Sequence, residues 1–211
     1  MAESPRRRQI LEALAAELEE RPGDRVTTAR LAQVVGVSEA ALYRHFPSKA
    51  DMFAELIAFS EESVFGIINR ISREERRPLD QVRLILGALL TFSERNPGIT
   101  RVLIGDALVG ENENLRIRVN QYFERLETQL RQVLREGASD WATGQAAEAQ
   151  AVAATAQLLT TMLEGRMRQY VRSGFERKPL LGWDAQWTLL AHILQPARGR
   201  ADPHDLAPRP T

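Results

Sequence analysis

The chain of 211 residues contains no cysteine, which excludes disulfides, thiolate zinc sites and cysteine nucleophiles. Aromatic residues are scarce, at 6%, and there is no excess of either charge: 28 basic residues balance 28 acidic ones, so net charge alone indicates neither a nucleic acid nor an acidic substrate as partner. Long apolar runs are absent too, because the stretches at 84–90 and 151–156 are too short to span a bilayer. We therefore expect a soluble, cytoplasmic protein.

The residues that are abundant, leucine, alanine, glutamate and arginine, favour helices. Apolar side chains recur at helical spacing along most of the chain, and proline, glycine or asparagine separates the periodic segments. This pattern predicts an all-α fold of about nine helices. Three parts are expected: one helical domain at 1–50, a larger helical domain at 51–195, and a disordered, proline-punctuated tail at 196–211.

The most informative segment runs from Thr27 to Lys49. A threonine at 27 or 28 can cap one short helix, Gly36 can adopt the positive φ of a tight turn, and Ser38 can cap a second helix that Pro47 ends. This arrangement predicts a helix-turn-helix between about Thr27 and Phe46, whose second helix begins with small or polar side chains that fit a major groove. The segment is also locally basic, although the whole chain is neutral.

The same residues match every position of T-x-x-x-L-A-x-x-x-G-V-S-x-x-x-L-Y-x-H-F-x-x-K, the DNA-binding signature of the TetR family of regulators, and the chain resembles that family. The resemblance implies an Ω-shaped homodimer. Its DNA-binding domain, at 1–50, would read a palindromic double-stranded DNA site with three helices, and its helical domain at 51–195 would serve dimerisation and partner binding. By position, it assigns phosphate contacts to Thr27, Thr28, Tyr43, His45 and Lys49. It assigns an approach to the base edges to Ser38, Glu39 and Ala40.

Three further segments, SEAALYRHFPSKADMF, SERNPGITRVLIGDAL and NQYFERLETQLRQVLRE, are similar to the nucleoid-occlusion members of that family. Such members act at the nucleoid, bind the C-terminal tail of the tubulin-like division protein FtsZ, and oppose assembly of the division ring. The resemblance implies an FtsZ-binding groove that is floored by Phe59, rimmed by Arg95 and suited to apolar anchors and acidic groups. The residues that it assigns to this surface are Phe59, Ala88, Thr91, Arg95, Asn96 and Ile99.

Two other interpretations have to be weighed. An ordinary TetR-type repressor would enclose a ligand cavity in its helical body and change the spacing of its two DNA-reading heads when the cavity is filled. An enzyme is not indicated, because the histidines are scattered and no metal-ligand pair or phosphate loop occurs, so we expect no catalytic residue, metal or cofactor.

We interpret one apolar set as the dimer core rather than a ligand pocket: Leu159, Met162, Leu163, Trp183 and Trp187.

Overall fold

The computed structural model describes residues 5–75, 77–137 and 145–194, and the predicted disordered tail lies outside these ranges. Within them the chain is all-helical, as the residue pattern predicts. None of the described helices is long and apolar enough to cross a membrane. The elements are α1 (Pro5–Glu20), α2 (Thr28–Val35), α3 (Glu39–His45), α4 (Lys49–Glu74), α5 (Pro78–Arg95), α6 (Pro97–Leu103), the 3₁₀ helix η1 (Asp106–Leu108), α7 (Glu113–Gly137), α8 (Gln145–Arg172) and α9 (Trp183–Leu194).

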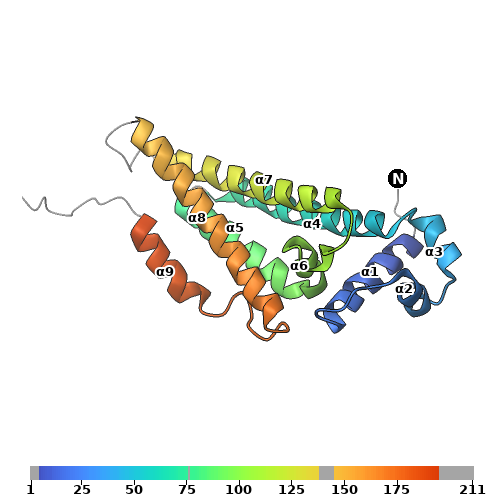
Figure 1. Cartoon of the computed structure of the whole chain (residues 1–211). Coiled ribbons are helices and arrows are strands. Elements are labelled where there is room, and N and C mark those ends of the chain that lie inside the picture. Colours follow the sequence, from blue (N-terminus) through green and yellow to red (C-terminus); the bar gives the residue numbers. More distant parts are fainter. Residues whose placement is uncertain (1–4, 76, 138–144, 195–211) are drawn as a thin grey trace, which may run out of the picture.

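Figure 1 shows α1, α2 and α3 gathered at one end of an elongated molecule. We call these three helices the head, and α4 to α9 the body. The long helix α4 starts at the head and continues along α7 and α5, while α8 crosses the bundle and α9 follows it. The short helix α6 lies against α1, so the head contacts the body at a second place besides α4.

The helix boundaries follow from residues that the sequence supplies locally. Thr27, Ser38 and Ser48 each cap a helix by accepting a backbone N–H with the side-chain oxygen. Gly36 has a φ of 73°, a conformation that favours glycine, and it closes α2. Pro78 and Pro97 stand in the first turns of α5 and α6, where proline lacks only a hydrogen bond that the helix would not make. The predicted helix-turn-helix is thus confirmed, and its second helix ends at His45, one residue before Phe46.

The apolar stripe of α7 supplies much of the body core. Leu126, Leu130 and Leu134 are fully buried, and Leu159 and Leu163 of α8 are buried as well. Together with α5, these helices form a packed bundle.

The interpretation of the apolar set at 159–187 as the dimer core is wrong for four of its five residues, the exception being the half-buried Met162. Leu159, Leu163, Trp183 and Trp187 are already buried within one protomer, so they have no surface left to offer a second copy. Trp183 and Trp187 pack on each other, with ring centroids 5.8 Å apart. The exposed apolar side chains of this region are other residues on the same helices: Leu158 of α8 and Leu189 and Ile193 of α9.

Candidate nucleic-acid interface and adjoining groove

The outer surface of the head is formed by the N-terminal ends of α2 and α3. Thr27 caps α2 by accepting the Arg30 N–H at 3.2 Å, and Ser38 caps α3 by accepting the Ala41 N–H at 3.2 Å. The inward residues Leu31 and Leu42 are buried against the rest of the head. Local capping and this small core therefore orient α3 with its first turn toward solvent, as a helix that enters a major groove requires.

Three of the sequence-predicted residues form one hydrogen-bonded cluster on this surface. The Thr28 hydroxyl donates to Glu39 Oε2 at 2.8 Å, and the Tyr43 hydroxyl donates to Thr28 Oγ1 at 3.4 Å. Tyr43 is 43% exposed, and Ala40 stands exposed next to Glu39. The fold thus brings residues 15 positions apart into contact at the tip of the head.

The other two predicted phosphate ligands, His45 and Lys49, are only partly exposed. The Lys49 amine donates to the Val26 carbonyl at 2.8 Å and pairs with Glu111 at 2.6 Å. The carbonyl of His45 accepts a hydrogen bond from Arg7. A phosphate contact by Lys49 therefore requires this internal ion pair to open, which the sequence gives no means of foreseeing.

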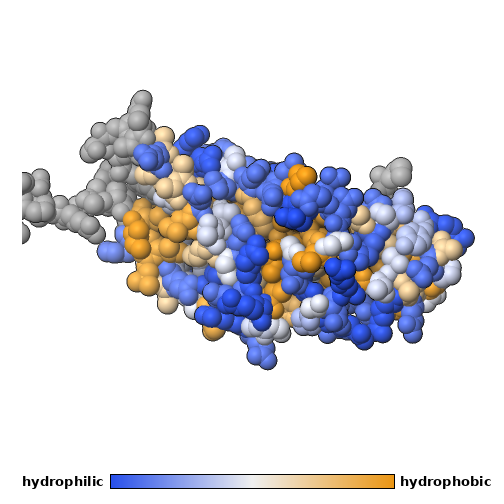
Figure 2. Space-filling view, viewed as in Figure 1, coloured by the Kyte–Doolittle hydropathy of each residue, from blue (hydrophilic) through white to orange (hydrophobic). Residues whose placement is uncertain are grey.

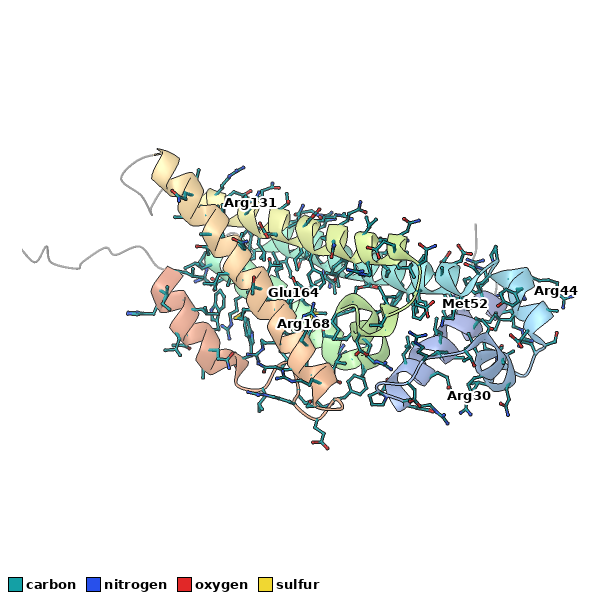
Figure 3. The ribbon with its side chains drawn as sticks, viewed as in Figure 1. Arg30, Arg44, Met52, Arg131, Glu164 and Arg168 are labelled. Carbon is teal, nitrogen blue, oxygen red and sulfur yellow. The ribbon has the colours of Figure 1, made fainter. Side chains whose placement is uncertain are left out.

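Arg44 is the cation that the residue-by-residue assignment missed. It is exposed on the last turn of α3, and no ion pair or hydrogen bond holds its side chain within the described residues. Figure 3 shows it at the far tip of the head, whereas Arg30, in α2, pairs with the buried Glu17. The available signal was its position in the basic segment, one residue after Tyr43.

A groove of about 380 Å³ lies beside the head, between α1 and α4. Phe59, which is 50% exposed, lines it together with Asn96 and Ile99, so three of the predicted partner-binding residues meet there. Ile99 is buried and contributes to the floor. The remaining lining residues come from two helices: Arg8, Leu11, Glu12 and Ala15 of α1, and Glu55, Leu56, Ala58 and Glu62 of α4.

The groove differs from the expected one in its rim. Arg95 is exposed but does not line it, and neither do the half-buried Ala88 and Thr91, which precede Arg95 along α5. The rim instead carries three carboxylates and Arg8. The sequence did not predict that α1 forms one wall of the groove. This wall arises from the packing of the head on α4, and no local motif indicates that packing.

Comparison with known proteins agrees with this architecture. Residues 10–56 match the family model of bacterial regulatory proteins, tetR family, and residues 76–195 match the SlmA-like model described as tetracyclin repressor-like, C-terminal domain. The chain belongs to the TetR family. Among its relatives are the nucleoid occlusion factors SlmA of Marinomonas sp. (strain MWYL1), 54% identical over 90% of this chain and 94% of the relative, and of Shewanella denitrificans, 53% identical over 92% and 98%.

Solved structures of other proteins are similar to this chain in fold alone. A fatty acid degradation regulator FadR from Bacillus halodurans superposes with a TM-score of 0.71 at 17% identity, covering 95% of this chain and all of that one. A TetR transcription regulator from Haloarcula marismortui superposes with a TM-score of 0.71 at 20% identity, covering 89% of this chain and 97% of that one. As a TetR-family protein, the chain is a DNA-binding regulator and not an enzyme.

The body of this TetR-family chain has a further hollow of about 410 Å³ between α6, α7 and α8. Charged side chains line it, including Glu127, Glu164 and Arg168, and Figure 3 shows the last two along α8. Burial raises the pKa of the Glu164 carboxyl, and the nearby Arg168 guanidinium opposes that shift. The hollow opens to solvent and is rich in charge, so it does not resemble the enclosed apolar cavity expected for a ligand-responsive repressor.

Proposed function

We propose that the chain is a nucleoid-occlusion factor: a homodimer that binds palindromic chromosomal sites, associates there with FtsZ and inhibits division-ring assembly over the nucleoid. The observation that carries this proposal is its 53–54% identity, along nearly the whole chain, with two proteins named nucleoid occlusion factor SlmA. The hollows of about 410 and 770 Å³ in the described part of the body both open to solvent, which favours this function over ligand-controlled repression.

For DNA, the proposal uses the outer surface of the head. Ser38, Glu39 and Ala40 approach base edges from the first turn of α3. Phosphate contacts come from Thr27, Thr28, Tyr43 and His45, and from Lys49 once it leaves Glu111. To these we add Arg44, because its guanidinium is exposed and has no internal partner among the described residues.

For dimerisation, the proposal uses the outer faces of α8 and α9. Leu158, Leu189 and Ile193 are 59%, 67% and 74% exposed, values that are unusual for large apolar side chains. Figure 2 shows apolar surface gathered over α9, at the left of the view. Two copies related by a two-fold axis bury this surface with four helices, two from each protomer.

For the FtsZ tail, the proposal uses the groove between α1 and α4. Phe59 and Ile99 offer apolar surface, and the Asn96 side chain offers polar groups to an extended peptide. Arg95, Thr91 and Ala88 lie along the adjoining end of α5 and extend the surface beyond the groove. Because carboxylates dominate the groove rim, we expect basic residues of the peptide at the groove and acidic ones toward Arg95.

Sedimentation of FtsZ polymers formed with GTP tests the proposal. Adding this protein together with its cognate DNA is expected to reduce the pelleted fraction, and Phe59→Ala is expected to abolish the reduction while DNA binding persists. Ile117→Ala is the matched control, since Ile117 is similarly exposed but lies on α7 outside the groove. Undiminished pelleting at saturating wild-type protein and DNA contradicts the proposal.

Genome-wide mapping of bound DNA separates the proposal from local repression. Sites spread over the chromosome and absent near the terminus are expected for an occlusion factor. One bound site beside the gene for this protein would instead favour an ordinary repressor.

A further inference from the structure

Arg101 of α6 is a buried cation that the proposed DNA and peptide surfaces do not use. Its side chain is 2% exposed. The guanidinium donates to the carbonyls of Leu18 and Arg21 at 2.9 and 2.8 Å, reaches that of Asp24 at 3.4 Å, and pairs with Asp106 at 2.6 Å. All three carbonyls belong to the C-terminal end of α1 and the turn that follows it.

This contact compensates a specific local charge. The last carbonyls of a helix have no partner within the helix and carry the negative end of its dipole. The planar guanidinium, with five donors, reaches the Leu18 carbonyl of α1 and two carbonyls of the following turn at once, which the single ammonium group of a lysine does less well. Asp106, placed by the turn after α6, completes the charge balance.

Gly98, one turn before Arg101, brings the two helices into backbone contact. A Cβ at position 98 would lie 2.1 Å from the Ala15 carbonyl oxygen and 3.0 Å from its carbon. Because those atoms are backbone, no side-chain rotation relieves the overlap, and α1 would have to move away from α6. The other end of α1 is held to α4 by the Arg7–Glu55 ion pair at 2.7 Å.

We propose that Gly98 and Arg101 are positioning residues for DNA binding. They hold α1, and with it the head, at one angle to the body, and thereby set the half-site spacing that a dimer accepts. The inference rests on the proposed dimer on a palindrome. One added base pair moves a half-site by about 3.4 Å and rotates it by about 35°, so only a dimer with fixed heads discriminates sharply between spacings.

The first experiment measures the head positions without DNA. The chain has no cysteine, so Gln33→Cys, at an exposed position of α2, takes one spin label per protomer. Pulsed electron–electron double resonance on the dimer is expected to give a narrow distribution of distances between the two labels. Gly98→Ala is expected to shift or broaden this distribution, and Arg101→Lys to broaden it to a smaller extent. Gly66→Ala is the control, because a Cβ there meets nothing within 4 Å. Distributions identical to the parent in both α6 variants overturn the proposal.

The second experiment uses duplexes built from mapped genomic sites, with the spacer lengthened or shortened by one or two base pairs. Wild type is expected to lose about tenfold in affinity for an altered spacer, and each α6 variant only a few-fold, with single half-site affinity unchanged. Retention of the full spacing preference by both variants overturns the inference. Wild type that shows no spacing preference contradicts the proposed palindrome-bound dimer instead. Arg101→Lys provides the test if Gly98→Ala does not fold.

Discussion

Two arginines, one at the tip of the head and one in the body where it contacts the head, have opposite environments. Arg44, at the tip of α3, is exposed and without an internal partner among the described residues, whereas Arg101, at the junction with the body, is buried among carbonyls and a carboxylate. An exposed cation is available to a phosphate, while a buried one is committed to holding helices together. Residue type therefore does not distinguish binding from positioning, but surroundings do.

Lys49 stands between these extremes. Its sequence position matches a DNA-contacting residue, yet its amine is held by the Val26 carbonyl and by Glu111. Any DNA contact by Lys49 thus competes with interactions that join the start of α4 to Val26 of the head and to Glu111, which lies between η1 and α7. Substitutions at Arg101, at Arg44, at the Glu111 partner of Lys49 and at a capping residue near them test the comparison.

The largest expected effect is at the junction. Arg101→Ala takes a buried donor away from the Leu18 and Arg21 carbonyls and from Asp106, and we expect the free energy of unfolding to fall by about 3 kcal/mol. Urea denaturation followed by circular dichroism measures it. Arg116→Ala is the control, because Arg116 forms an exposed ion pair worth at most about 1 kcal/mol. Equal losses in the two variants would contradict the buried role of Arg101.

A smaller loss is expected at the start of α3. Ser38→Ala removes the side-chain acceptor for the Ala41 N–H, which costs about 1 kcal/mol of unfolding free energy in the protein without DNA. Thermal or urea unfolding checks this value. Ser72→Ala, at an exposed position within α4, is expected to change stability by no more than a few tenths of a kcal/mol.

At the tip, Arg44→Ala is expected to leave stability unchanged and weaken binding to all DNA sequences. Losing one phosphate contact reduces the slope of log affinity against log salt by about 0.9. Fluorescence anisotropy titrations at several salt concentrations measure the slope. Arg70→Ala removes an exposed arginine from α4, away from the head, and should leave the slope unaltered.

The smallest effect is expected at Lys49. Glu111→Gln weakens the ion pair that holds the amine, so DNA affinity should rise about two- to threefold and the salt slope should steepen. The same titrations measure both quantities. A fall in affinity would show instead that the pair holds the head in its DNA-binding position.

The sequence predicted most features that depend on neighbours along the chain. The caps at Thr27 and Ser38 and the turn at Gly36 are all local, because helix formation and capping involve residues only a few positions apart. The TetR-family signature is likewise a local motif, and through it the fold and the position of the DNA-reading helix followed.

Tertiary packing decided the rest. Contacts between residues far apart in sequence decide three features. They decide which face of α8 and α9 is buried within the protomer, which helix forms the groove wall opposite Phe59, and which cations are already paired. Periodicity shows that a helix has an apolar face but does not name its partner. The sequence by itself therefore determined the helices and the DNA-reading motif, whereas only the assembled structure decided which side chains stay free to bind, because burial and pairing arise between elements.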